Sequence, residues 1–310
     1  MLLTAIGAYW EIENNRRGGL LTKQEGTQMA YGKSIELFLA NGTADSLITA
    51  ELSNWNGKAI KIPRIEVSGC KREDIKGAGI YFLFCKEDDD SDSVYIGEAE
   101  NIQERLIQHL RDYAAEKEKY YWNTAVLFVG RDLNKALIRY LENSLVEAAR
   151  ASKRYLVLTK NTYRNTVMKE SQIAAMEEFV DNIKVLISAL GYKVLEPMIQ
   201  SNSPLNQGSQ ILYLNSGSTD ATAMITTEGF VLLAGSSVND KATMKSLSAG
   251  MIKLRNKHLD SGKVKDWKTT EDILFSSSSA AAGFILGYSV SGPAIWKDKN
   301  GKALKEIEAE

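Results

Sequence analysis

The sequence predicts an α+β protein that is divided into more than one domain. Its 310 residues exceed what one small hydrophobic core requires. Between residues 34 and 63, short apolar segments are joined near Asn41-Gly42 and Asn56-Gly57. Asn-Gly pairs favour β-hairpins, because both residues tolerate positive φ. Further along the chain, segments of strand length are interspersed with amphipathic segments of helix length, as in mixed folds.

The N-terminal part is expected to open with β structure, with strands over 34–39, 46–55 and 58–63. Residues 1–28 do not continue this pattern. The run Lys23-Gln24-Glu25-Gly26 can be encoded by the purine-rich sequence expected just upstream of a bacterial start codon. We therefore expect translation to begin naturally at Met29, and residues 1–28 to form a tail that is not native.

The central part alternates strands with capped helices. Strands are expected over 79–84, 94–97 and 124–129. Asn101 and Glu104 form a capping-box pattern that starts a helix running to about residue 118. Two further helices are expected over about 134–152 and from Ser171 to Gly191.

A polar stretch, Gln200–Ser209, is the best candidate for a linker, because it is rich in turn-forming residues. Strands are expected after it over 211–214, 221–226 and 230–234, then a basic helix over about 243–259 and a short helix that opens near Ser276.

Charge is distributed unevenly along the chain. The net charge is −1, but residues 241–305 carry twelve Lys and Arg against five acidic residues, a local net charge of +7. This excess indicates either a polyanion partner such as nucleic acid, or a lysine-rich solvated surface.

The composition excludes several classes of protein. A hydrophobic content of 44% and a charged content of 25% are typical of a globular protein, not of a disordered, collagen-like or coiled-coil chain. No apolar run approaches the roughly 18 residues that a membrane-spanning helix requires. Cys70 and Cys85 show no metal or redox spacing, which favours a reducing cytoplasm.

One set of residues in the sequence indicates a catalytic site. Gly79-Ile80-Tyr81 is followed by Tyr95-Ile96-Gly97, then by Arg105 and, four residues later, by His109. This order and spacing resemble the GIY-YIG nuclease family over about residues 76–163. The resemblance implies a small α/β sandwich, a mainly antiparallel three-stranded sheet flanked by helices. It also implies that Glu142 binds a metal ion and that Asn161 supports the site.

The residues themselves agree with that chemistry. Phosphodiester hydrolysis needs a base for water, positive charge for the transition state and usually a divalent cation. Tyr81 is the candidate base, Arg105 the stabilising cation, and Tyr95 and His109 are expected to orient water or phosphate. A single carboxylate, Glu142, suits Mg²⁺ or Mn²⁺, because these ions keep several water ligands when they bind to a protein. Where several family members have lysine after the second triplet, this chain has Glu98.

Residues from about 210 to 306 resemble domain of unknown function 4357, which often accompanies this nuclease family. Its charge, with Trp267 and Trp296 available for stacking or for the core, leads us to expect DNA binding, with Lys253, Arg255 and Lys257 of the basic helix as contacts. The expected organisation is a tail (1–28), an N-terminal β segment (29–70), the GIY-YIG nuclease domain (71–163), a helix and linker (164–209) and a basic C-terminal α+β domain (210–310).

The resulting expectation is a cytoplasmic, metal-dependent DNA endonuclease, with a role in restriction, repair or defence implied only by the resemblance. Two alternatives stay open: a nucleic-acid-binding protein whose nuclease site is idle, and a protein-interaction scaffold. The strandedness of the DNA, the choice between DNA and RNA, and the oligomeric state do not follow from the sequence.

Overall fold

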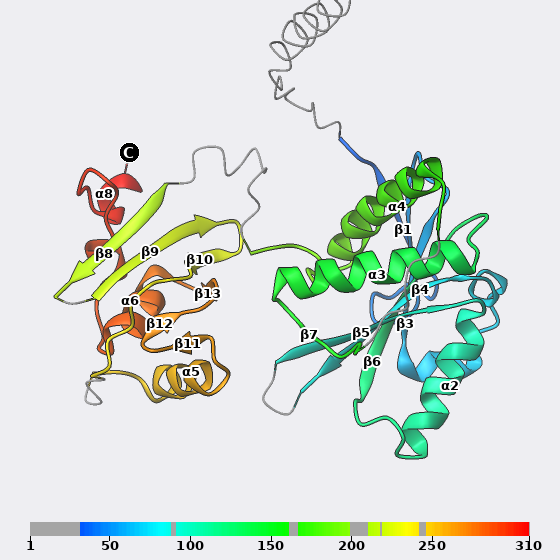
Figure 1. Ribbon diagram of the computed structural model, residues 1–310, viewed down its shortest axis with the longest axis horizontal. Helices are drawn as coiled ribbons and strands as arrows, with labels where there is room; N and C mark the ends of the chain where they lie inside the picture. The colour runs from blue at the N-terminus through cyan, green and yellow to red at the C-terminus, as the bar shows by residue number, and fades with distance from the viewer. Residues whose placement is uncertain are drawn as a thin grey trace, which may run out of the picture. The chain divides into compact units, whose positions relative to one another are not determined.

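The computed structural model describes residues 32–87, 91–160, 167–198, 210–217, 219–241 and 246–309. The expectations for residues 1–28 and for the linker 200–209 lie outside these ranges. The α+β fold class is confirmed, because both large sheets are antiparallel-rich and are covered by helices (Figure 1).

The first sheet contains seven strands among the described residues, in the order β1-β2-β3-β6-β4-β5-β7. These strands are β1 (Ile35–Leu39), β2 (Ile48–Leu52), β3 (Lys58–Pro63), β4 (Gly79–Lys86), β5 (Asp92–Ala99), β6 (Trp122–Val129) and β7 (Leu156–Val157). From β2 to β5 neighbouring strands are antiparallel, and β7 joins the edge of β5 in parallel.

The N-terminal strands extend the expected three-stranded sheet. Strand β3 pairs with β6 along its whole length, from Lys58 opposite Val129 to Pro63 opposite Thr124. Strands β1 to β3 therefore continue the sheet that carries both tripeptides, and Ile60 and Ile62 of β3 are fully buried in its core.

Helices cover both faces of this sheet. The face that carries Tyr81 and Leu83 packs against α2 (Ile102–Ala114) and the 3₁₀ helices Arg64–Gly69 and Glu73–Lys76. The other face packs against α3 (Lys135–Ser152) and α4 (Glu170–Ala189). Successive side chains of a strand point to opposite faces of the sheet, so each buried strand contributes side chains to the core on both faces.

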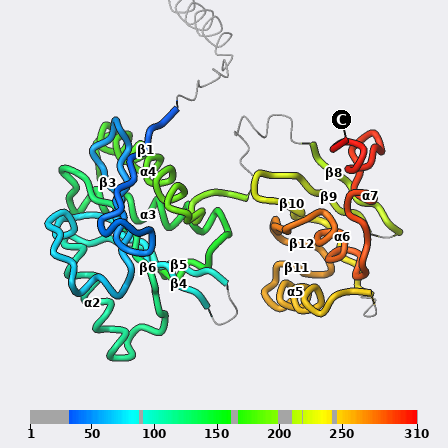
Figure 2. Tube along the Cα trace, turned by 180° about the vertical axis from the view of Figure 1, so that it is seen from behind, coloured from blue at the N-terminus to red at the C-terminus, as the bar shows by residue number. Residues whose placement is uncertain are grey.

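The second sheet belongs to the C-terminal part and has the order β13-β10-β9-β8. Its strands are β8 (Ile211–Ser216), β9 (Thr219–Thr226), β10 (Gly229–Leu232) and β13 (Ile273–Phe275). The apolar helix α6 (Ser278–Leu286) packs on it, as the reverse view in Figure 2 shows, and α7 (Gly292–Ile295) and α8 (Leu304–Ile307) follow. A separate hairpin, β11 (Val264–Lys265) and β12 (Lys268–Thr269), comes after α5 (Ala249–Asp260).

Three of the helices have boundaries that differ from the expected ones. Helix α4 starts one residue before Ser171, because the backbone N–H of Lys169 donates to Gln172 and closes the first turn there. Helix α2 ends at Ala114, well before residue 118. Helix α5 starts at Ala249, with the Ser248 hydroxyl as its cap. Among the described residues, no helix is long and apolar enough to span a bilayer.

Candidate active site

The two tripeptides lie side by side on the antiparallel pair β4–β5. Tyr81 is opposite Gly97 and Leu83 is opposite Tyr95, so both tyrosines project from the same face of the sheet. Their ring centroids are 6.1 Å apart in a stacked arrangement. The expected convergence of the two phenols is therefore present.

Glycine at position 97 is required by this packing. A Cβ atom there would lie 2.4 Å from the Tyr81 hydroxyl and 2.9 Å from the Tyr95 ring, distances that real Cβ atoms do not adopt. The Tyr81 side chain therefore lies directly over the backbone of Gly97. It is 1% exposed, and the rings of Tyr95 and His109 pack beside it.

Helix α2 brings the cation and the imidazole to the Tyr81 hydroxyl. The Asn101 side chain caps the helix by accepting from the backbone of Glu104 at 3.2 Å, as the sequence predicts. Arg105 Nε donates to the Tyr81 oxygen at 3.2 Å, and that hydroxyl lies 3.0 Å from Nε2 of His109. The i,i+4 spacing places Arg105 and His109 on one face of the helix, as expected.

His109 is bonded on both of its nitrogens. Its Nδ1 lies 2.6 Å from the Glu118 carboxylate, in the segment after α2. Burial, reinforced by the Arg105 cation, lowers the pKa of His109 to about 3, so the ring is neutral. Because the carboxylate accepts, Nδ1 carries the proton and Nε2 accepts from the Tyr81 O–H.

This arrangement corrects the expectation that His109 itself orients water or phosphate. Its side chain is fully buried, and both nitrogens are occupied by Tyr81 and Glu118. His109 can act on a substrate only through Tyr81. Glu118 was not among the predicted site residues, since nothing in the local sequence distinguishes it from the neighbouring acidic residues.

Tyr81 and Arg105 each have a defined protonation state. Burial raises the pKa of Tyr81 well above its usual range, and the nearby Tyr95 hydroxyl adds to the effect. The phenol is therefore neutral before reaction. Arg105 is half-buried, and contact with Tyr81 more than offsets its burial, so its pKa is raised and the guanidinium stays charged.

Glu142 lies on α3 and is 6% exposed. It is close to Glu98, the residue after Gly97, and burial together with the charge of Glu98 raises the pKa of Glu142 to about 7. Lys135, on the same helix, holds Glu98, with Nζ 2.8 and 2.9 Å from its two carboxylate oxygens. Since Gly97 and Glu98 face opposite sides of β5, Glu142 and Tyr81 flank the end of that strand.

The donor set fits a hard divalent cation. Oε2 of Glu142 is buried and has no hydrogen-bond partner among the described residues, which is the state of a carboxylate oxygen that can accept a cation. No group of three or more His, Cys, Asp or Glu side chains forms a metal cluster within the described ranges. One carboxylate completed by water and substrate phosphate is a coordination that Mg²⁺ accepts.

The predictions for the remaining site residues differ in how they compare with the structure. Asn161 lies outside the described residues. Arg255 was expected to contact DNA but is 5% exposed, and its guanidinium donates to the carbonyl oxygens of Phe284 and Asn239. It ties α5 to α6, so that expectation is wrong. Lys253 is exposed on α5, and Lys257 is half-exposed.

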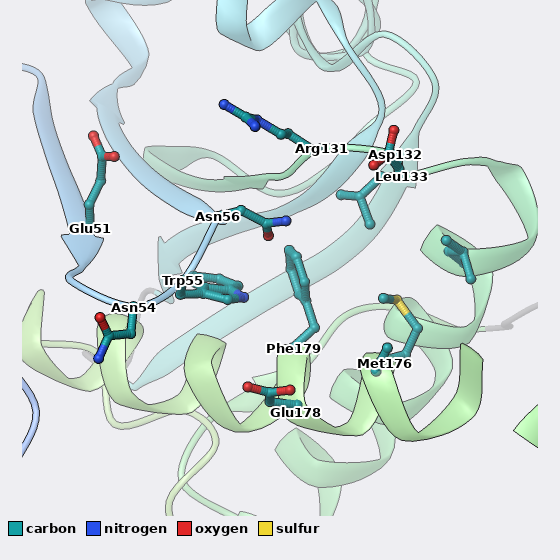
Figure 3. A pocket seen from close by; sticks show the side chains of 12 residues that line it. Glu51, Asn54, Trp55, Asn56, Arg131, Asp132, Leu133, Met176, Glu178 and Phe179 are labelled. Atoms are coloured by element: carbon teal, nitrogen blue, oxygen red, sulfur yellow. The ribbon is translucent and has the colours of Figure 1, made fainter. Parts of the chain in front are cut away.

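The site does not coincide with a cavity of about 790 Å³ that is lined by residues of β2, α3, α4 and the loops beside them (Figure 3). Trp55 and Phe179 form its aromatic wall, with ring centroids 4.6 Å apart, and Arg131 and Asp132 stand at its rim. None of the predicted site residues that the structure describes lines this cavity.

A neutral tyrosine held between a guanidinium and an imidazole, with the buried Glu142 carboxylate on α3, is a combination suited to a phosphodiester-cleaving hydrolase. Residues 77–155 match the GIY-YIG catalytic domain, and residues 212–308 match a domain of unknown function, DUF4357. The chain therefore carries a catalytic domain of the nuclease type, followed by DUF4357, as the sequence indicates. GIY-YIG nucleases generally use divalent metal ions. Searches of curated proteins and of solved structures gave no significant match.

Proposed function

We propose that the protein is a metal-dependent endonuclease that hydrolyses phosphodiester bonds in DNA, with the C-terminal domain contributing to DNA binding. The observation that carries the proposal is the position of the Tyr81 hydroxyl, within hydrogen-bonding distance of both Arg105 and His109. The GIY-YIG match supports the nuclease class, and the geometry supports the individual roles.

Tyr81 acts as the general base through a proton relay. The oxygen of a water molecule attacks phosphorus, and a proton of that water passes to the Tyr81 oxygen. The bond from phosphorus to the leaving sugar oxygen breaks, and that oxygen takes a proton from solvent. The phenolic proton moves at the same time to Nε2 of His109, 3.0 Å away. Glu118, hydrogen-bonded to Nδ1, then stabilises the imidazolium that forms. This relay removes the need for a free tyrosinate, which burial disfavours.

Arg105 stabilises the charge that develops on the phosphate oxygens. Its guanidinium is held at Tyr81 and stays protonated, so it is oriented before the substrate arrives. Tyr95, half-buried beside Tyr81 and His109, is positioned to orient water or phosphate.

Glu142 would hold the divalent cation, Mg²⁺ or Mn²⁺, through its unpartnered Oε2. When bound, such an ion supplies Lewis-acid polarisation of the phosphate and neutralises charge at the scissile bond. Asn161, which the family resemblance implies as a support of this site, is part of the same proposal.

The test is cleavage of a labelled panel of single-stranded DNA, double-stranded DNA, branched DNA and RNA, with Mg²⁺, Mn²⁺ or chelator. Arg105→Ala and Glu142→Gln are each compared with a matched control on the same helix, Arg111→Ala and Glu147→Gln, which are exposed. We expect metal-dependent cleavage that falls about 10²- to 10⁴-fold in the site variants only. Retention of a nucleic acid without cleavage would instead support an idle binding protein, and neither activity would support a scaffold.

A further inference from the structure

The two tryptophans of the C-terminal domain have opposite environments. Trp296 is fully buried, its Nε1 donates to the Ser278 carbonyl at 2.9 Å, and its ring packs 5.0 Å from that of Phe230. It belongs to the core. Trp267 is 40% exposed, at the tip of the hairpin formed by β11 and β12. Only Trp267 is available to a ligand.

The tip of this hairpin has an unusual backbone. Asp266 and Trp267 are its two turn residues, with φ of 51° and 57°, both in the left-handed region. Two-residue turns of this kind favour Asn-Gly or Asp-Gly, because a residue with a bulky side chain is strained there. A tryptophan at the second position is unfavourable for the turn itself. Strained residues that persist in a structure are concentrated at sites of function.

Two lysines flank the turn on one face of the hairpin. Lys265 and Lys268 are directly opposite each other in the register of the strands, and both are exposed. Like charges at directly opposed positions destabilise a β-pair. Neither lysine has an ion-pair partner among the residues that the structure describes, whereas the neighbouring Lys263 pairs with Glu271 at 2.8 Å. An anion bound between these lysines would relieve their repulsion.

The hairpin is held firmly against its domain. The backbone N–H of Val238 donates to the Trp267 carbonyl at 2.7 Å. Thr269 is bonded through its backbone to Ser236 at 2.9 Å and to Gly235 at 2.7 Å, and Val264 is buried. The aromatic ring and the two ammonium groups are therefore presented by a fixed backbone, which lowers the entropy lost on binding.

We propose that this hairpin binds an unpaired nucleotide of a nucleic acid, with the base stacked on Trp267 and the flanking phosphates between Lys265 and Lys268. Aromatic stacking with backbone neutralisation is the common mode of single-strand binding. An acidic peptide would satisfy the lysines but leave the exposed, strained tryptophan without a role. The inference rests on the proposed function only in that the substrate is a nucleic acid. It replaces Arg255 of α5 as the expected contact.

Binding is measured on the full chain carrying Glu142→Gln, in chelator, so that cleavage is not needed. The probes are an oligothymidylate, a blunt duplex of equal length and a polyglutamate peptide. We expect the oligothymidylate to quench the fluorescence of Trp267, seen as the difference from Trp267→Phe, and to bind more tightly than the duplex. Equal quenching by polyglutamate, or no quenching by any probe, would overturn the proposal.

Two sets of variants measure the lysine contacts and the stacking on Trp267 separately. Lys265→Gln with Lys268→Gln should flatten the dependence of log affinity on log salt by about 1.4, roughly 0.7 for each phosphate on a single strand. The matched pair Lys297→Gln with Lys299→Gln, also exposed on this domain, should leave that slope unchanged. Asp266→Asn with Trp267→Gly should weaken single-strand binding by about 5- to 150-fold.

The variant Asp266→Asn with Trp267→Gly also controls for misfolding. It should fold normally, because Asn-Gly is the preferred sequence for this turn. We expect its melting temperature to be equal to or above that of the parent chain, although its binding is weaker. A higher melting temperature with unchanged binding would show that Trp267 has no ligand. Binding by the hairpin without cleavage by the wild-type chain would reject the proposed function alone, and cleavage with no effect of the hairpin variants would reject this inference alone.

Discussion

The hydroxyl of Tyr81 lies 3.0 Å from Nε2 of His109, across the interface between strand β4 and helix α2. The two residues are 28 positions apart in the chain. Their contact joins a phenol that burial keeps neutral to an imidazole that burial keeps unprotonated. A proton can therefore move from the first to the second without either group being charged beforehand.

The relay predicts that removal of the imidazole affects the chemical step. His109→Gln should lower the single-turnover rate by about 10²- to 10⁴-fold, the usual contribution of a positioned acid–base group. Glu118→Gln should also lower it, because an amide can present its N–H₂ to Nδ1 and favour the wrong tautomer. The exposed Glu104 on α2 provides the control, as Glu104→Gln. A Glu118→Gln rate equal to the wild-type rate would contradict the relay.

Metal dependence should vary with pH in a defined direction. Because the pKa of Glu142 is raised to about 7 by burial and by Glu98, its carboxyl is protonated below that pH and a cation must displace the proton. The apparent affinity for Mn²⁺ should rise by up to about tenfold per unit between pH 5 and 7, then level off above pH 7. Mn²⁺ titrations of the cleavage rate at pH 6 and pH 8 measure this. Equal midpoints at the two pH values would contradict the assignment.

The same carboxyl should lower stability at alkaline pH. The pKa of Glu142 is higher in the folded state than its ordinary value of 4.5, so the folded state binds this proton more tightly. The stability that protonation contributes is fully present below about pH 4.5 and is lost as the pH rises to about 7. Glu142→Gln should therefore be more stable than wild type by about 1–3 kcal/mol at pH 8 without metal. Urea denaturation at pH 8 and pH 5 should show a smaller difference at pH 5, and a larger one there would refute the assignment.

Gly97 should tolerate no side chain. Gly97→Ala places a methyl group 2.4 Å from the Tyr81 hydroxyl, so the phenol must move away from Arg105 and His109. We expect a loss of about 1–3 kcal/mol in stability from overpacking, together with loss of cleavage. Gly69→Ala is the control, since a Cβ there meets nothing within 4 Å. Full activity of Gly97→Ala would mean that the position of Tyr81 is not important.

Local sequence patterns predicted the parts of the fold that depend on neighbouring residues. The Asn101 cap, the strands that carry the two tripeptides and the shared helix face of Arg105 and His109 follow from short-range periodicity and capping. The pairing of β3 with β6 could not be predicted, because it joins segments more than sixty residues apart and no local signal specifies which edge a strand will join.

Three features of the candidate sites depend on tertiary structure alone. Glu118 reaches His109 only because α2 ends at Ala114 and the chain turns back. Arg255 lies in a basic segment but is drawn inward by two carbonyl oxygens. The exposure of Trp267 is set by the hairpin turn, whereas the equally apolar Trp296 is in the core. The local sequence does not distinguish any of these residues from similar residues nearby.

The most direct test of the account is the single-turnover cleavage rate of Tyr81→Phe, measured with saturating Mg²⁺ beside Tyr95→Phe. The first variant removes only the hydroxyl that joins Arg105 to His109, and the ring still fills its space over Gly97. The relay predicts a loss of about 10²- to 10⁴-fold in rate for Tyr81→Phe, with unchanged DNA binding. A Tyr81→Phe protein that cuts DNA at the wild-type rate would show that this hydroxyl does not carry the proton of the attacking water.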